Sequence, residues 1–260
     1  MNEYTLITGA TSGIGYELVK LFAKDKDNLI LVARNEEKLN EIKKDLTEKY
    51  GIDVIVIPMD LSIIENSKKL YDKTKELNLK VVKLINNAGF GDSCEFINCK
   101  IEKINQMIDL NMKALTNLTY YYANDMKENK YGRILNVASV AAYLAGPYMG
   151  VYYASKAYVM NFSIALAVEM KKYNVKISIL CPGPTKTDFA HKAEFKNENS
   201  FNKYASKPEK VAKIAYKKFR RGKLIINPGF VVKLIAFGTR IMPRKFVAKR
   251  SAGLNNSRVK

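Results

Sequence analysis

The chain has 260 residues, a length that fits one large α/β domain, and 47% of them are hydrophobic, enough for a sizeable core. Its formal charge is +19, of which residues 207–260 carry +15, so the body is nearly balanced and the C-terminal segment is the basic element. A single histidine, His191, argues against histidine triads and histidine-rich metal sites.

The cysteines and the N-terminus point to a reducing compartment. Cys94, Cys99 and Cys181 form no even, short-spaced framework, so we expect neither a disulfide scaffold nor a metal site such as zinc. The first strand is expected from about Tyr4, which leaves no room for an apolar signal segment. No apolar run reaches the roughly 18 residues that cross a bilayer. The sequence thus predicts a cytoplasmic protein.

A glycine-rich turn follows the first expected strand, residues 4–8, and leads into a helix with Leu18, Leu21 and Phe22 on one face. Such a turn lets backbone amides approach a phosphate, and the helix N-terminus adds its positive dipole end. The alternative is a tight turn that needs glycine for its geometry alone. We favour dinucleotide binding, with contacts from Gly9, Thr11, Ser12, Gly13, Ile14 and Gly15.

Arg34 follows the second expected strand, residues 28–33. In a dinucleotide fold this strand ends beside the adenosine ribose, where an acid binds the 2′-hydroxyl group and an arginine accommodates a 2′-phosphate. Because no acid adjoins Arg34, the sequence favours NADP(H), with NAD(H) left open. The alternative is that Arg34 only caps the helix expected from Asn35.

Polar residues also end the third and fourth expected strands, residues 54–59 and 81–85. Asp60, followed by Leu61, would accept a hydrogen bond from the adenine amino group or cap the next helix, and the sequence leaves both open. Residues 86–89, Asn-Asn-Ala-Gly, combine amides that fix neighbouring backbones with small residues that let a cofactor approach. Asn111 lies inside a helical region expected over residues 101–127, where position alone suggests a solvated or capping residue.

Tyr152 and Lys156 are four residues apart, so a helix places them on one face. An ammonium group beside a phenol lowers the pKa of the phenol, and a tyrosine tuned in this way exchanges a proton with a substrate oxygen near neutral pH. Ser139 follows the strand expected over residues 132–138, where its hydroxyl group is placed to bind the same oxygen. The alternatives are a surface Tyr–Lys pair and Tyr153 as the acid, although Tyr153 has no lysine four residues further on.

Strands and helices alternate along the chain, which predicts parallel pairing with right-handed crossovers. The expected fold class is α/β, a single Rossmann-type doubly wound parallel sheet of about seven strands with helices on both faces. We assign residues 1–228 to this domain, with a substrate loop at about residues 188–206, and residues 229–260 to a basic, partly apolar extension.

Together these motifs resemble the short-chain dehydrogenase/reductase family over roughly residues 4–190. The glycine turn, Asp60, the segment of residues 86–89 and Pro182-Gly183 with Thr187 occur in the family's order. The resemblance implies an NADP-preferring carbonyl reductase with the catalytic tetrad Asn111, Ser139, Tyr152 and Lys156. Beyond the glycine turn, it implies cofactor contacts from Arg34, Asp60, Leu61, Asn87, Ala88, Gly89, Tyr152, Lys156, Pro182, Gly183, Thr185 and Thr187.

The resemblance also implies roles for the tetrad. Hydride would pass between the nicotinamide and a carbonyl or alcohol carbon, with the protein supplying orientation and protons. Tyr152 would be the general acid, Ser139 would polarise the substrate oxygen, and Lys156 would hold the nicotinamide ribose and lower the pKa of Tyr152. Asn111 would hold a water that links Lys156 to solvent. A homo-oligomer, dimer or tetramer, would form through the helices that carry Asn111 and Tyr152.

The apolar loop of residues 141–151 favours a small hydrophobic substrate: a ketone, an aldehyde or a 3-oxoacyl group, or the corresponding alcohol. The fold and the charge also allow two other functional classes. A nonenzymatic cofactor-sensing or binding protein is disfavoured by the intact tetrad. A nucleic-acid binder is disfavoured because the cations are interleaved with long aliphatic residues in one terminal segment, so we expect no nucleic acid partner.

Residues 229–242 predict an apolar helix of ~21 Å, too short for the ~30 Å hydrocarbon core of a bilayer. Pro243 ends or kinks it, and Arg244, Lys245, Lys249 and Arg250 follow. An apolar helix bordered by cations suits peripheral contact with a membrane surface through residues 229–250. The alternatives are packing over the substrate pocket or against a partner subunit, and binding of an acidic protein partner such as an acyl carrier.

Overall fold

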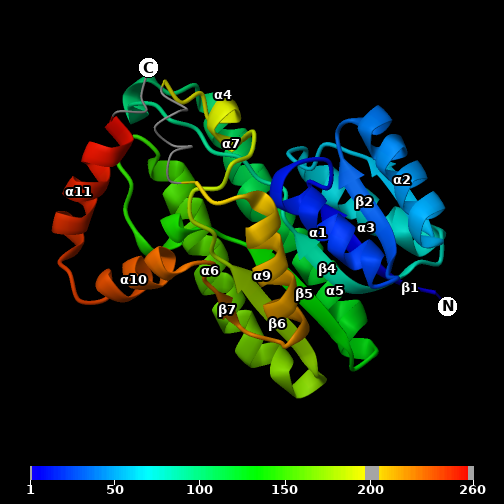
Figure 1. Ribbon diagram of the computed structural model, residues 1–260. Coiled ribbons are helices and arrows are strands. Elements are labelled where there is room, and N and C mark those ends of the chain that lie inside the picture. The colour runs from blue at the N-terminus through cyan, green and yellow to red at the C-terminus, as the bar shows by residue number, and fades with distance from the viewer. Residues whose placement is uncertain (1, 197–204, 257–260) are drawn as a thin grey trace.

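The computed structural model describes residues 2–196 and 205–256 (Figure 1). Its centre is a seven-stranded parallel sheet in the order β3-β2-β1-β4-β5-β6-β7. The strands are β1 (Glu3–Thr8), β2 (Asn28–Ala33), β3 (Val54–Pro58), β4 (Lys80–Asn86), β5 (Gly132–Val137), β6 (Val175–Leu180) and β7 (Ile225–Ile226). The predicted doubly wound α/β fold is therefore confirmed. The strand order reverses between β1 and β4, the place where such sheets bind ligands.

Helices cover both faces of the sheet because both faces are apolar. On one face lie α1 (Gly13–Lys24), α2 (Glu36–Tyr50) and α9 (Pro208–Arg220); on the other lie α3 (Ile64–Glu76), α5 (Leu115–Glu128) and α6 (Gly150–Met170). Successive strand residues alternate between the two cores: Ile7 packs on the first face and Leu6 on the second. The strands consequently read as continuous apolar runs.

A chain of buried polar side chains ties the centre of the sheet to the second layer of helices. The Asn86 amide on β4 donates to Asn136 Oδ1 on β5 at 2.9 Å and to Thr119 Oγ1 on α5 at 3.0 Å. The Asn136 amide donates to Ser163 Oγ on α6 at 2.9 Å. All four residues are buried. Residues 86–89 are expected to fix neighbouring backbones; Asn86 also binds side chains on β5 and α5, and through Asn136 the chain of hydrogen bonds reaches α6.

The helix expected over residues 101–127 is not uniform. It consists of α4 (Ile101–Ile108), a π-helical segment, η2 (Asp109–Ala114), and α5. Asn111 lies in the π-helical segment and is buried, which corrects the solvated position that its place in a helix suggested. A π-helical turn inserted in an α-helix is frequent at functional sites, because it redirects side chains without breaking the helix.

The C-terminal extension also differs from a single helix over residues 229–242. The structure has α10 (Phe230–Gly238), a turn through Pro243 and α11 (Arg244–Asn256). Figure 1 shows both helices at the end of the molecule opposite α2. Part of the expected substrate loop, residues 197–204, lies outside the described residues, and α7 (Phe189–Lys192) precedes it. Among the described helices, none is long and apolar enough to cross a membrane.

Candidate active site

A cavity of about 1760 Å³ opens along the carboxyl ends of the strands. Ligand pockets of proteins commonly measure ~300–1,000 Å³, so this one has room for more than one ligand. The glycine turn, the ends of β2 to β6, α6 and the C-terminal helices line it. Most of the predicted site residues face it: Gly9, Thr11, Ser12, Gly13, Ile14, Arg34, Asp60, Leu61, Asn87, Ala88, Gly89, Ser139, Tyr152, Lys156, Pro182, Gly183, Thr185 and Thr187.

The glycine turn is held by close backbone packing. Gly9 and Gly13 have φ angles of 64° and 57°, the left-handed region that glycine adopts without strain. The Asn87 amide donates to the carbonyl oxygens of Thr8 at 3.0 Å and Gly9 at 3.1 Å, which anchors the turn to the end of β4. Gly15 does not line the cavity; a Cβ atom there would lie 2.2 Å from Gly9 O, so it serves close packing.

The turn fits the phosphates of a dinucleotide. A Cβ atom on Gly13 would lie 2.9 Å from Thr187 Cγ2, so glycine permits the close approach of the turn to Thr187 at the N-terminus of α1. Backbone N–H groups and the helix dipole at this N-terminus favour negative charge. The turn therefore suits the phosphates of a dinucleotide.

At the far end of the cavity, Arg34 and Asp60 face each other. Arg34 Nη1 lies 3.9 Å from Asp60 Oδ2, and the Arg34 side chain is 72% exposed. Asp60 Oδ1 accepts hydrogen bonds from Ser62 N and Oγ, which lie before α3; the N-cap of α3 is Ile63, so the expected cap by Asp60 is not seen. The N-cap of α2 is Asn35, whose side chain accepts from Lys38 N at 2.8 Å. Arg34 is thus not required as a cap, and its guanidinium group is directed to the cavity.

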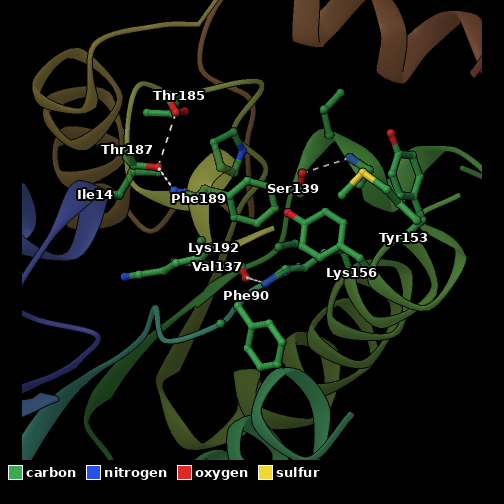
Figure 2. Close-up of a pocket in the computed structure, with 18 of the residues that line it drawn as sticks. Ile14, Phe90, Val137, Ser139, Tyr153, Lys156, Thr185, Thr187, Phe189 and Lys192 are labelled. Carbon is green, nitrogen blue, oxygen red and sulfur yellow. Dashed lines mark hydrogen bonds between the residues drawn. The ribbon is translucent and has the colours of Figure 1, made fainter. Parts of the chain in front are cut away.

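The catalytic candidates converge where β4, β5 and α6 meet. Lys156 Nζ donates to Val137 O at 3.0 Å, and Figure 2 shows this contact with Ser139 and Phe189 around the same space. Ser139 Oγ accepts from Ala141 N at 3.1 Å. The Tyr152 ring packs against Phe189 with ring centroids 5.2 Å apart.

Asn111 is fixed from two sides. Its amide donates to Phe90 O at 2.9 Å and to Ser155 Oγ at 3.1 Å, and its Oδ1 accepts from Phe90 N at 3.1 Å. A Cβ atom on Gly89 would lie 2.9 Å from Asn111 Oδ1 and 3.3 Å from Lys156 Nζ. Gly89 therefore keeps open the space between the amide and the ammonium group.

The pKa of Tyr152 differs from the expectation. Burial raises the pKa of Tyr152 to about 12, partly opposed by a hydrogen bond with Ser139. Lys156 Nζ lies 5.8 Å from the centroid of the Tyr152 ring and is bound to Val137 O, so the predicted lowering by Lys156 is not seen. Burial also lowers the pKa of Lys156 to about 8, because the charged form loses hydration.

The C-terminal helices form part of this cavity, a position that the sequence leaves open. In the structure they complete its wall with apolar side chains: Leu234, Ile235, Met242, Phe246, Val247 and Leu254. The signal in the sequence is the apolar run of residues 229–242, which is compatible with packing over the pocket, with a partner subunit, with a membrane surface and with an acidic protein. The assignment of residues 229–260 to a separate extension stays a prediction.

Cys94 and Cys99 form a disulfide, with Cα atoms 5.6 Å apart, which corrects the expectation that they remain unpaired. Pairing was not expected because the three cysteines form no framework across the chain, whereas Cys94 and Cys99 close a single short loop. Asp92 Oδ and the two sulfurs lie within 4.8 Å of one another, but the disulfide occupies both sulfurs. The inference of a reducing compartment loses this support.

Known proteins of one enzyme family are similar to this chain in sequence and structure. Residues 3–198 match the family model described as short chain dehydrogenase. An 11-beta-hydroxysteroid dehydrogenase-like protein of Arabidopsis thaliana is 30% identical over 93% of this chain and 78% of its own. A 3-oxoacyl-[acyl-carrier-protein] reductase of Rickettsia conorii is 31% identical over 75% of this chain and 78% of its own.

Among solved structures, a short-chain dehydrogenase from Sphingobium yanoikuyae in complex with NADPH aligns with a TM-score of 0.83 at 28% identity, over 92% of this chain and 93% of its own. The chain belongs to the short-chain dehydrogenase family. It is accordingly an oxidoreductase that uses a nicotinamide cofactor.

Proposed function

We propose that this enzyme reduces the carbonyl group of a hydrophobic ketone, aldehyde or 3-oxoacyl compound to an alcohol with NADPH. One observation carries the proposal: Ser139, Tyr152 and Lys156 line one cavity together with a glycine turn suited to a dinucleotide. A bound nicotinamide supplies the hydride, and the chain supplies orientation and protons.

Tyr152 acts as the general acid. Its pKa of about 12 keeps the hydroxyl proton in place at neutral pH, so that the proton is available when negative charge develops on the carbonyl oxygen. Ser139 donates its own hydroxyl hydrogen to the same oxygen. Lys156, at the floor of the cavity, binds the nicotinamide ribose. Asn111 holds the water that connects Lys156 to solvent, across the space that Gly89 keeps open.

The preference for NADPH rests on Arg34. Its exposed guanidinium group lines the cavity beyond the end of β2. Lys38 in the first turn of α2 lines the cavity as well, with its ammonium group bound to Glu41 Oε2 at 2.6 Å. A cation at this position favours a 2′-phosphate over a 2′-hydroxyl group. The relative from Sphingobium yanoikuyae was solved with NADPH, which supports the same preference.

The substrate class follows from the other wall of the cavity. Leu144, Met149, Phe189 and Phe195 line it together with the apolar side chains of the C-terminal helices. Such a lining binds apolar surface and offers little to a sugar. The relatives named for hydroxysteroids and 3-oxoacyl groups support a bulky hydrophobic substrate.

The test is NADPH consumption over a panel of 3-oxoacyl thioesters, steroid ketones and simple ketones or aldehydes. We expect turnover with at least one apolar carbonyl and none with sugars. If NADPH binds but no carbonyl is reduced and no alcohol oxidised with NADP, a nonenzymatic cofactor-binding protein replaces the proposal.

The proposal includes a homo-oligomer, a dimer or tetramer, formed through α5 and α6. These helices expose apolar side chains, with Tyr120 65% and Val168 74% exposed, which an interface would cover. Sedimentation velocity at micromolar concentration is expected to show a species larger than the monomer. A strict monomer would remove this part of the proposal.

A further inference from the structure

The outward face of α10 carries large apolar side chains that the described part of the chain leaves uncovered. Five side chains on α10 and in the following turn are between 59% and 78% exposed: Phe230, Val231, Leu234, Phe237 and Ile241. The inward face is fixed, because Val232 and Ala236 are buried one turn apart and Val232 packs on Gly183. Exposed apolar patches of this kind mark interaction sites.

The charged residues of the segment that carries this face are all cations. Residues 229–260 contain no aspartate or glutamate. Six cations in this segment have exposed side chains: Lys233, Arg240, Arg244, Lys245, Lys249 and Arg250. A partner surface that covers the apolar face must therefore carry negative charge to match them.

The same face borders the mouth of the substrate cavity. Leu234, Met242 and Phe246 line the cavity and are also 59%, 48% and 47% exposed. A side chain that both lines a cavity and meets solvent lies at its rim. The part of the rim formed by these residues is therefore apolar, with the exposed Arg250 also lining the cavity, and it continues into the outward face of α10 through Leu234.

We propose that α10 and the beginning of α11 dock this enzyme on an anionic membrane surface, with the apolar rim turned toward the lipid. At nine residues, α10 is about 14 Å long, so it lies in the plane of the interface and does not cross a ~30 Å hydrocarbon core. Its apolar side chains enter the acyl boundary and the flanking cations meet phosphate head groups.

An anionic lipid surface fits better than the two protein alternatives. A second copy of this chain, paired through the same face, would bring the two sets of cations together, and like charges oppose association. An acidic protein would satisfy the cations but would leave unexplained why the exposed apolar side chains lie in line with the cavity rim. Docking would let an apolar carbonyl substrate pass from the bilayer into the cavity, a consequence that rests on the proposed function, whereas docking itself does not.

The first test is co-sedimentation of the full chain with vesicles of phosphatidylcholine, with and without phosphatidylserine. We expect binding to the anionic vesicles, weakened by salt. Phe237→Ser removes an exposed aromatic that does not line the cavity, and it should weaken binding about tenfold or more. The matched control is Leu77→Ser, an exposed apolar residue at the end of α3, which should bind as the wild type does.

Charge is tested separately. Lys233→Glu with Lys245→Glu should reduce binding to anionic vesicles, and the same change at Lys213 and Lys217 on α9 should reduce it far less. Equal loss in both double variants would mean that net charge alone attracts the vesicles, and this would overturn the assigned face. Absence of binding at low salt would overturn docking altogether.

Activity separates docking from the proposed reaction. With a ketone that partitions into vesicles, Phe237→Ser should raise KM when anionic vesicles are present, while KM for a water-soluble ketone stays unchanged. Turnover without vesicle binding would refute docking and leave the reaction standing. Suppose instead that the wild type is an oligomer that does not bind vesicles, and that Phe237→Ser dissociates it. A second copy of the chain then covers the face, and the proposal is wrong.

Discussion

The two walls of the cavity are built in different ways. On the cofactor wall, Asn87 and Lys156 bind backbone carbonyl groups of other elements, as does the buried Asn111, which does not itself line the cavity, at 2.9–3.1 Å. On the wall formed by α10 and α11, the lining side chains are mostly apolar and several are about half exposed. Proton and hydride transfer depend on fixed geometry, whereas apolar recognition depends on the area removed from water. We infer that one wall sets the reaction and the other sets which substrates reach it.

The largest expected effect lies on the cofactor wall. Tyr152→Phe should lower kcat by about 10²–10⁴-fold, the usual contribution of a positioned acid, because the ring still packs on Phe189 but carries no proton. The dissociation constant of NADPH should not change. Tyr153→Phe is the control and should be mild, since the Tyr153 hydroxyl group contacts Asn255 on α11. A larger loss in the control would assign the acid to Tyr153.

Lys156 offers a second test of the same wall, through stability. Burial lowers its pKa from 10.5 to about 8, so between these pH values the unfolded chain holds a proton that the folded chain has released. Stability therefore rises with pH across this window, and the wild type should gain up to roughly 3 kcal/mol relative to Lys156→Met. Urea unfolding of both proteins at each end of the window measures the difference. If the free energy of unfolding of the wild type fails to rise relative to that of Lys156→Met across this window, the pKa of Lys156 is not lowered in the folded protein.

The adenosine end of the same wall should determine the choice of cofactor. Arg34→Asp should lower the ratio of kcat/KM for NADPH to that for NADH by about 10–100-fold, since a charge-assisted hydrogen bond is worth ~1.5–3 kcal/mol. Lys43→Asp makes the same charge change on the exposed side of α2, outside the cavity lining, and should leave the ratio unchanged. Equal kcat/KM values for both cofactors in the wild type would contradict the assignment.

The smallest effect is expected on the apolar wall. Phe246→Ala should raise KM for a bulky apolar ketone about fivefold, because a half-exposed phenylalanine contributes only part of the ~1.5–3 kcal/mol of a fully buried one. The KM for NADPH should stay the same. Phe96→Ala, a change at an exposed residue outside the cavity lining, is the control. If Phe246→Ala alters NADPH binding as strongly as substrate binding, the division between the walls is wrong.

The cofactor wall could be predicted from the sequence because its signals are local. The glycine turn, the amides that end β4 and the Tyr152–Lys156 spacing each lie within one strand–turn–helix unit. The structure brings these segments into one cavity as the parallel order of the strands requires.

Other features depended on tertiary structure and could not be predicted. The raised pKa of Tyr152 reflects its burial, which residue spacing does not reveal. The position of Asn111 reflects a π-helical segment that has no sequence pattern of its own. The Cys94–Cys99 disulfide closes a loop between β4 and α4, and the apolar run of α10 does not reveal which of its residues line the cavity.

The hydrogen-bonded chain of Asn86, Asn136, Thr119 and Ser163 helps to set the register between β4 and β5. Burial of apolar side chains alone does not fix this register, since a slip of two residues would still bury aliphatic side chains on the same face. Such a slip would separate the two amides and leave polar groups unpaired in the core, at ~1–3 kcal/mol each. Ser139 follows Asn136 by three residues, so the register that the amides select also places the Ser139 hydroxyl group, to which we assign a catalytic role, at the cavity.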